Sequence, residues 1–298
     1  MPYYQLLPAR GLLRVTGPDR MAFLQGITSN DVRKAAPDRA LFSALLTPQG
    51  KFLHDFFILA DEEGLWLEVD SERRQDLLRR LKIYKLRSKV TLEDFSETYE
   101  IAALFGDDAF VALDMPPEPG RARSWGSGIL YVDPRLPALG ARAILPREGA
   151  EAILAAAGFA PAAGDAYDAH RLALGVPDGS QDLTVEKSTL LESNYDELNG
   201  IAWDKGCYLG QELTARTKYR GLVKKRLVSA KVDGPLPEPG TPIRRDGREV
   251  GEIRSGRDGR AMALVRLDAL DATGLTAGDA RIAVETPGYV RLPQPSDG

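Results

Sequence analysis

The sequence predicts an α+β protein that ends in a small all-β domain. Its 298 residues suit about two domains. Up to about residue 220, strand patterns are interspersed with helix patterns. Beyond that point short strands follow one another with turn signals and no helix. Hydrophobic residues make up 43% of the chain and charged residues 28%, which is typical of globular proteins and argues against general disorder.

The first hundred residues alternate between strand and helix patterns. Apolar runs and alternation predict strands over residues 12–17, 40–47, 51–60, 65–70, 89–96 and 99–106. Pro18 suits the first turn of a helix over 17–31, in which apolar residues recur at helical spacing. Ser71 suits the N-cap of a second helix over 71–86. We expect a first lobe to give way to a second near residue 95.

The remainder of the chain is less regular. Proline and glycine predict a loop over 115–128, which precedes a strand over 141–146 and helices over 147–158 and 164–175. Residues 176–203 exceed the usual connection of about 4–6 residues, which indicates a functional loop or a wrapped segment. The strands that predict a small barrel or sandwich cover 224–234, 247–256, 260–270 and 280–286.

Composition limits the classes of function. The formal net charge of −4 argues against electrostatic nucleic-acid binding by the whole molecule. One cysteine cannot form an internal disulfide or a self-contained zinc or cluster site, and His54 and His170 lie far apart in sequence. The chain shows no secretory signal pattern, and no apolar stretch reaches about 18 residues. A cytoplasmic location is therefore expected.

Cys207 lies in the segment DKGCYLGQE, between two glycines. The thiolate is the reactive form of cysteine, and nearby positive charge lowers the thiol pKa. Lys205 precedes Cys207 by two residues, and Arg216 and Lys218 follow it. The alternative is that Cys207 packs as a small apolar residue, which is the commoner role of a free cysteine. The spacing alone leaves both interpretations open.

Residues 216–226 carry six positive charges in eleven residues. This run would attract a phosphate, a carboxylate tail or RNA, and it would equally suit a charged edge strand that resists aggregation. The glycine-rich segment before it matches neither the GxGxxG pattern nor a Walker loop, and GxSxG is absent from the sequence. Nucleotide-binding enzymes of those kinds are not indicated.

His54 and Asp55 are adjacent polar residues in the apolar strand predicted over 51–60. Neighbours in a strand point to opposite faces, so at most one of them faces a given pocket. Asp55 is a candidate acid–base or ligand-binding carboxylate. It could equally be a structural acceptor of backbone N–H groups, since a buried carboxylate needs partners.

Four segments together resemble one family. KGCYLGQE at 205–212 is similar to the signature of YgfZ-type folate-binding proteins, relatives of the aminomethyltransferase (T-protein) of the glycine cleavage system. FLQGITSNDV at 23–32, LLTPQGKFLHDFFIL at 45–59 and HRLALGVPDG at 170–179 occur in matching order and spacing. The mitochondrial members that assist iron–sulfur assembly carry a very similar cysteine motif. The resemblance covers essentially the whole chain.

The resemblance implies a fold and a cofactor. The fold is α+β, with a folate-binding body over 1–220 made of two intertwined α/β lobes around a central folate cavity. A C-terminal antiparallel β-barrel follows over 221–298. The cofactor is tetrahydrofolate or a derivative, with the pterin in an apolar pocket and the glutamate tail at Arg or Lys. No permanently bound metal is implied.

Two positions depart from the T-protein pattern. T-proteins carry adjacent acids where this chain has His54 and Asp55, so one acid is missing. They also carry a pterin-binding glutamate where this chain has Ala173. A methyl group would leave the donors of the pterin unpaired, at a cost of about 1–3 kcal/mol each. Both departures argue against T-protein chemistry.

The sequence therefore predicts a folate-binding accessory protein for assembly or repair of iron–sulfur clusters in a subset of client enzymes, including tRNA-modifying ones. Cys207 is the expected functional thiol, with nearby basic residues favouring its thiolate. The expected partners are cluster enzymes or cluster carriers and folate, with no membrane and no nucleic acid as a direct ligand. The residues expected to bind the cofactor are Lys205, Gly206, Tyr208, Gln211, Glu212, Arg216 and Lys218.

Two other functions remain open at this point. One is a tetrahydrofolate-dependent one-carbon transferase with Asp55 as the acid–base residue, which is the class expected if the protein is an enzyme. The other is a non-enzymatic RNA-binding module that uses residues 216–226 and the barrel. Its affinity for RNA would fall steeply with salt.

Overall fold

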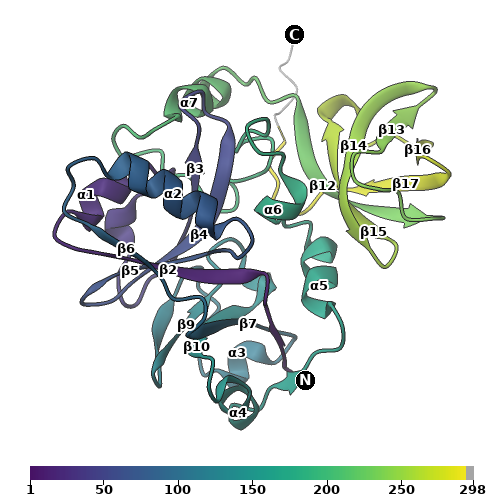
Figure 1. The fold of residues 1–298 in the computed structure, drawn as a ribbon. Helices are drawn as coiled ribbons and strands as arrows, with labels where there is room; N and C mark the ends of the chain where they lie inside the picture. The colour runs from purple at the N-terminus through teal and green to yellow at the C-terminus, as the bar shows by residue number, and fades with distance from the viewer. Residues whose placement is uncertain (293–298) are drawn as a thin grey trace. The chain divides into compact units, whose positions relative to one another are not determined.

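The computed structural model describes residues 1–292 and divides into two compact units, each assembled from separate stretches of the chain (Figure 1). The first unit comprises Met1–Leu46, Leu53–Tyr167 and Leu198–Leu209. The second comprises Thr47–Phe52, Asp168–Glu197 and the chain from Gly210 on. The mixed α and β architecture with a closed antiparallel barrel at its C-terminal end, expected from the sequence, is confirmed.

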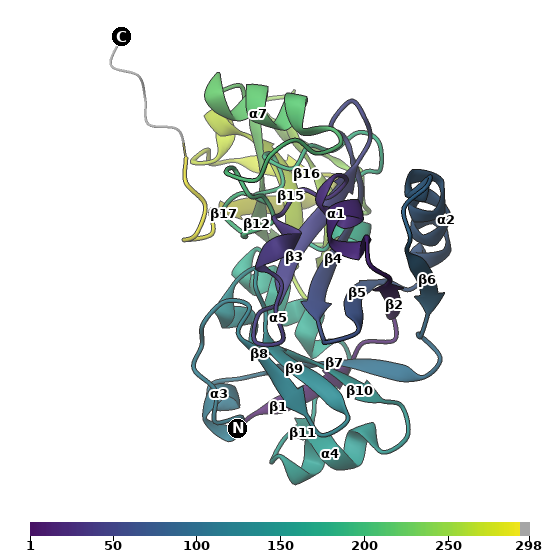
Figure 2. The same ribbon diagram turned by 90° about the vertical axis from the view of Figure 1, so that its left-hand side faces the viewer.

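The first unit holds a five-stranded sheet in the order β3-β4-β5-β2-β6. Its strands are β2 (Arg10–Thr16), β3 (Leu41–Leu46), β4 (Phe52–Ala60), β5 (Gly64–Asp70) and β6 (Thr91–Asp94). Every residue of β3 and all but the last of β4 are buried, which accounts for their unbroken apolar runs. Helix α2 (Arg74–Lys85) lies beside β2 (Figure 2), and its leucines are buried.

The helix predicted over 17–31 is shorter in the structure. Helix α1 covers only Arg20–Gln25, and a 3-10 turn, η1, follows at Val32–Lys34. Ile27 and Thr28 still donate to the Leu24 carbonyl of the helix, whereas Ser29 and Asn30 bond to other parts of the unit. The Ser29 amide donates to the Ala44 carbonyl, and its hydroxyl donates to the Gly200 carbonyl. Tertiary partners thus end the helix where its apolar spacing would have continued it.

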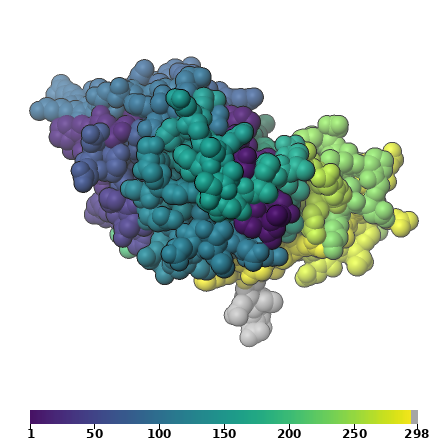
Figure 3. All heavy atoms as spheres, turned by 90° about the horizontal axis from the view of Figure 1, so that it is seen from below, coloured from purple at the N-terminus to yellow at the C-terminus, as the bar shows by residue number. Residues whose placement is uncertain are grey.

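The second sheet of the first unit has the order β11-β1-β7-β10-β9-β8. Its strands are β1 (Tyr3–Leu6), β7 (Tyr99–Phe105), β8 (Ala122–Trp125), β9 (Gly128–Val132), β10 (Ala141–Pro146) and β11 (Ala160–Pro161). Strand β1 runs parallel to β11, so the purple start of the chain lies against teal residues near 160 (Figure 3). Helices α3 (Ala109–Ala112) and α4 (Ala150–Ala156) contribute to its apolar core, and η2 (Pro137–Leu139) precedes β10.

The second unit contains a closed barrel in the order β12-β15-β14-β13-β16-β17. Its strands are β12 (Lys225–Asp233), β13 (Pro242–Arg245), β14 (Arg248–Arg257), β15 (Arg260–Arg266), β16 (Leu275–Ala277) and β17 (Ala280–Glu285), with the turn η3 (Leu267–Ala269) after β15. Strand β12 pairs with both β15 and β17, which closes the ring. Alternate residues Val228, Ala230 and Val232 fill its core. The barrel, one of two all-β folds left open by the sequence, is the one observed.

The remaining helices are α5 (Ala166–Leu174), α6 (Gly179–Asp182) and α7 (Gln211–Tyr219). The long weakly periodic segment 176–203 holds α6 and a series of turns. The predicted loop 115–128 contains β8, and strands β1, β13 and β16 have no counterpart in the prediction. These are short strands of three or four residues whose pairing partners decide their structure. No helix within residues 1–292 is long and apolar enough to cross a membrane.

A cluster of buried charges joins the two sheets of the first unit. Glu68 of β5 is fully buried and binds the guanidinium of Arg142 and the hydroxyl of Tyr131, both from the second sheet. The Nε atom of Arg10 donates to the same carboxylate at 3.0 Å. Burial alone would raise the pKa of Glu68, but Arg142 and Arg10 lower it to about 2. The carboxylate is therefore charged at every physiological pH. The Arg142 guanidinium also lies 4.8 Å from the centre of the Phe57 ring, a cation–π distance.

We predict that Glu68→Gln lowers the free energy of unfolding by about 3–5 kcal/mol, because it leaves the Arg142 charge buried with weakened compensation. Urea unfolding followed by tryptophan fluorescence measures this change. Tyr131→Phe removes a single hydrogen bond and should cost less, about 1–3 kcal/mol. An unfolding midpoint for Glu68→Gln equal to that of the parent protein would contradict the role assigned to this cluster.

Candidate functional site

The cysteine predicted to be functional lies on an irregular segment of the first unit, residues 203–209, here called the cysteine loop. Cys207 is exposed, so it is not the packed apolar residue that a lone cysteine often is. Gly206 beside it is also exposed, and Tyr208 is half-buried. A cysteine whose side chain is open to solvent can meet groups on another molecule.

Lys205 anchors the cysteine loop to the body of the first unit. Its side chain is 2% exposed, and its Nζ atom donates to the carbonyl oxygens of Thr28 at 2.5 Å and Asn30 at 2.7 Å. The same ammonium lies 5.0 Å from the centre of the Tyr208 ring, a cation–π distance. The Leu209 amide donates to the Gly26 carbonyl at 3.0 Å. Both ends of the loop are therefore held by the segment 26–30.

The stretch before the cysteine loop is held by the same segment. Asn30 Nδ2 donates to the Asn199 carbonyl at 2.7 Å, and the Ala202 amide donates to the Ser29 carbonyl at 3.1 Å. The resemblance gave residues 23–32 no role of their own. The structure shows that this motif supplies the carbonyl, hydroxyl and amide groups on which residues 199–209 are built.

The charge of Lys205 is directed inward. Burial lowers the pKa of Lys205 to about 8, while the nearby Asp31 carboxylate acts in the opposite direction. A pKa near 8 keeps most of the lysine protonated at neutral pH, and its ammonium protons are directed to backbone carbonyls. The sequence spacing had suggested Lys205 as a charge acting on the thiol. The geometry supports a positioning role for its side chain.

The remaining predicted cofactor residues belong to α7 in the second unit. Gln211 is the first residue of α7, and Glu212 and Arg216 form an exposed pair one helical turn apart at 3.9 Å. Lys218 is exposed near the end of the helix. An exposed pair of this kind contributes about 0.3–0.5 kcal/mol. The roles of these four residues stay predictions.

A pocket of about 710 Å³ in the first unit adjoins the cysteine loop, here called the body pocket. Trp203 and Asp204 belong to both the loop and the pocket wall. Buried Phe42 and Ile201 supply apolar wall, and amides and two cations complete the lining. The cations are Lys34, whose Nζ is 3.4 Å from the Asp204 carboxylate, and Arg39, which forms no ion pair with any residue of the described chain.

His54 and Asp55 lie in β4, and neither lines the body pocket. The Nε2 atom of His54 is 2.9 Å from the Asp76 carboxylate of α2. Burial, and next the charge of Arg73, lower the pKa of His54 to about 4, although Asp76 opposes the shift. His54 is therefore neutral at pH 7 and occupied by a structural contact. Asp55 is buried in the same strand.

Comparison with known proteins places this geometry in a class. Residues 9–115 match the family described as the GCVT N-terminal domain, and residues 224–292 match the CAF17 C-terminal β-barrel domain. The fold resembles that of the glycine cleavage system aminomethyltransferase T from Bartonella henselae, with a TM-score of 0.78. That match covers 97% of this chain and 86% of the other at 17% sequence identity, so it shows the fold alone. The protein thus combines an aminomethyltransferase-type fold with a CAF17-type barrel.

Curated relatives are nearer in sequence. The mitochondrial iron–sulfur cluster assembly factor IBA57 of Homo sapiens is 34% identical over 87% of this chain and 76% of its own length. The Mus musculus protein is 33% identical over 89% of this chain and 77% of its own length. The chain belongs to the IBA57 family of iron–sulfur cluster assembly factors, which confirms the resemblance seen in the sequence.

Fungal members of the family are longer than this chain. The Mycosarcoma maydis homologue is 36% identical, and the match spans 74% of this chain but 55% of that protein, so the chain spans about half its length. The Neurospora crassa homologue is matched over 54% of its length. The cytoplasmic location expected from the sequence is wrong, because these relatives are named as mitochondrial proteins.

We predict that Lys205→Met releases the cysteine loop. The carbonyls of Thr28 and Asn30 would lose their donor, at a cost of about 1–3 kcal/mol of unfolding free energy. Hydrogen exchange of the Leu209 amide should accelerate, since its bond to Gly26 depends on a docked loop. Lys82→Met is the matched control, because this exposed lysine lies on α2, outside the loop, and should change stability by only about 0.5 kcal/mol. Unchanged exchange at Leu209 in Lys205→Met would show that the loop is held by something else.

Proposed function

We propose that this protein is an accessory factor in the assembly or repair of iron–sulfur clusters, and that Cys207 contacts the cluster during transfer. Membership of the IBA57 family supports the process. The observation that carries the role of the thiol is its exposure on a loop that the buried Lys205 holds in place. A flexible surface cysteine would need no such anchor.

The chemistry of the thiol determines how many cluster ligands this protein can supply and how many must come from a partner protein. A thiolate is a soft ligand for iron, and binding releases the thiol proton. Common iron–sulfur clusters take four protein ligands, usually cysteine thiolates. With one cysteine in the chain, this protein supplies one of them, and the others come from a carrier or client protein. It therefore acts on a cluster in transit between other proteins.

The body pocket suits a folate. Its apolar wall of Phe42, Ile201 and Trp203 fits a flat pterin ring, and Lys34 and Arg39 fit the carboxylates of a glutamate tail. Its volume of about 710 Å³ falls within the usual range for small-molecule pockets. When bound, a tetrahydrofolate would supply a reduced pterin ring next to Trp203 and Asp204, the first residues of the cysteine loop. The predicted cofactor residues Lys205, Gly206 and Tyr208 follow the pocket residues Trp203 and Asp204 directly in the chain.

One-carbon transfer is less well supported than cluster assembly. The position of the missing T-protein acid holds His54, whose ring is engaged by Asp76. The position of the pterin-binding glutamate is Ala173, which has no hydrogen-bonding side chain. We further propose that tRNA-modifying cluster enzymes are among the clients, which the resemblance to YgfZ-type proteins favours.

Replacing the thiol tests the proposal. We expect Cys207→Ala to abolish the ability of the protein to restore cluster-enzyme activity in cells that lack it. The unfolding midpoint should stay within about 0.5 kcal/mol of the parent, because the side chain is exposed. Cys207→Ser keeps the shape without the soft ligand and should fail equally. Full restoration by Cys207→Ala would remove the thiol from the mechanism.

A second test addresses the folate. We expect titration with tetrahydrofolate to quench the fluorescence of Trp203 and Arg39→Gln to weaken the affinity by roughly fivefold, the effect of losing one rim cation. Arg87→Gln makes the same change at an exposed arginine outside the pocket and should leave the affinity unchanged. Equal affinities in the two variants would place the folate elsewhere.

A further inference from the structure

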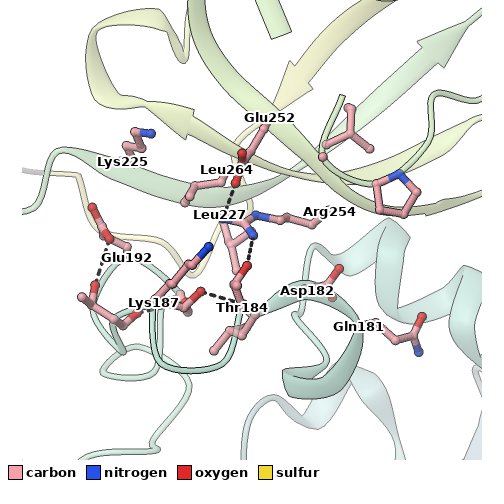
Figure 4. Close-up of a pocket in the computed structure, with 17 residues that line it drawn as sticks. Gln181, Asp182, Thr184, Lys187, Glu192, Lys225, Leu227, Glu252, Arg254 and Leu264 are labelled. Atoms are coloured by element: carbon pink, nitrogen blue, oxygen red, sulfur yellow. Dashed lines mark hydrogen bonds and ion pairs between the residues drawn. The ribbon is translucent and has the colours of Figure 1, made fainter. Parts of the chain in front are cut away.

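A second pocket, in the unit that contains the barrel, has no part in the function proposed above. It has a volume of about 550 Å³ and is here called the barrel pocket (Figure 4). One wall is the segment 181–193, which begins with the last residues of α6, and the other comes from β12, β14, β15 and the turn before β13. Every lining residue belongs to the second unit, so the pocket is built within one compact body.

Arg254 is the central cation of the barrel pocket. Its side chain is 15% exposed, and its Nη1 atom donates to the Thr184 hydroxyl at 2.6 Å. Its Nη2 atom lies 2.5 Å from the Glu252 carboxylate (Figure 4). The buried Nε atom has no hydrogen-bond partner among residues 1–292. A buried donor without an acceptor costs about 1–3 kcal/mol, so this guanidinium retains capacity for another acceptor.

Two lysines add positive charge that the protein does not neutralise. Lys187 and Lys225 line the pocket, and neither forms an ion pair with any residue that the structure describes. Figure 4 shows the Lys187 side chain extending across the space between segment 181–193 and the barrel wall. Of the three acids in the lining, Asp182 is neutralised by Arg171 at 2.7 Å, and Arg171 does not line the pocket. The remaining lining therefore carries three cations against Glu192 and Glu252.

The uncharged residues of the barrel pocket indicate which other groups a ligand would carry besides an anionic one. Leu227, Leu264 and Pro239 give one side an apolar surface, whereas Ser188 and Thr189 place hydroxyl groups on the other. Inorganic phosphate alone would leave the apolar side unused. A ligand that carries an oxyanion on a compact apolar body would contact both.

We propose that the barrel pocket binds a small organic anion, with its phosphate or carboxylate group between Lys187, Lys225 and Arg254 and its apolar body against the barrel wall. This site is separate from the body pocket and the cysteine loop, since it shares no lining residue with them. The proposal does not depend on the function proposed above, because it rests only on groups of the second unit.

Calorimetric titration of the full chain tests the proposal with phenyl phosphate, phenylacetate and inorganic phosphate as probes. We expect at least one aryl anion to bind more tightly than inorganic phosphate, and the two aryl probes tell a phosphate ligand from a carboxylate one. Lys187→Gln should weaken that binding by roughly fivefold and leave the melting temperature unchanged, because the side chain is exposed.

Lys224→Gln is the matched control, since it removes an exposed lysine beside Lys225 that does not line the pocket. Equal losses in Lys187→Gln and Lys224→Gln would mean that the probes respond only to net charge, and this would overturn the proposal. Absence of binding by both aryl probes at millimolar concentration would overturn it as well. Arg254→Met adds a separate measurement, in which lost binding with a retained barrel, shown by circular dichroism, supports the site.

Discussion

The ammonium group of Lys205 can be buried only because two backbone carbonyl oxygens accept its protons. Those carbonyls belong to Thr28, whose amide still donates to the Leu24 carbonyl of α1, and to Asn30, whose amide donates to the Ser43 hydroxyl instead. The early end of one short helix, the position of the cysteine loop and the exposure of Cys207 therefore depend on one another. Because the ammonium group only donates hydrogen bonds, the segment 26–30 has to present acceptors to it, and the two carbonyl oxygens are those acceptors.

The first unit surrounds this contact with an unusually charged interior. Glu68, Tyr131 and Arg142 are all buried, and they join the two sheets through charge-assisted hydrogen bonds. A nonpolar interior could gain similar stability, but it would tolerate small shifts of one sheet against the other. Bonds with fixed donors and acceptors select one arrangement. The loop that carries the thiol is mounted on that arrangement through β3 and the segment that precedes it.

Features set by residues near one another in the sequence were predictable, and features set by contacts between distant segments were not. Strand β4 was predictable because its residues are buried on both faces, and Cys207 was identifiable because its motif is contiguous. The inward direction of Lys205 was not, since its acceptors lie 175 and 177 residues earlier in the chain. The body pocket escaped prediction for the same reason: its wall combines Phe42, Pro134 and Trp203, which no local pattern connects. Strand β8 was missed because half of its residues are exposed.

The interleaved course of the chain has a consequence for the order in which the protein can be made. The first unit is complete only when Leu198–Leu209 takes its place, after the intervening residues Asp168–Glu197, which belong to the other unit, have been synthesised. Synthesis must therefore reach Leu209 before the first unit can close. Until then the carbonyl oxygens of Thr28 and Asn30 lack the hydrogen bonds that Lys205 donates in the finished structure. The cysteine arrives with the last piece, so a newly made chain gains its thiol and its finished scaffold at the same moment.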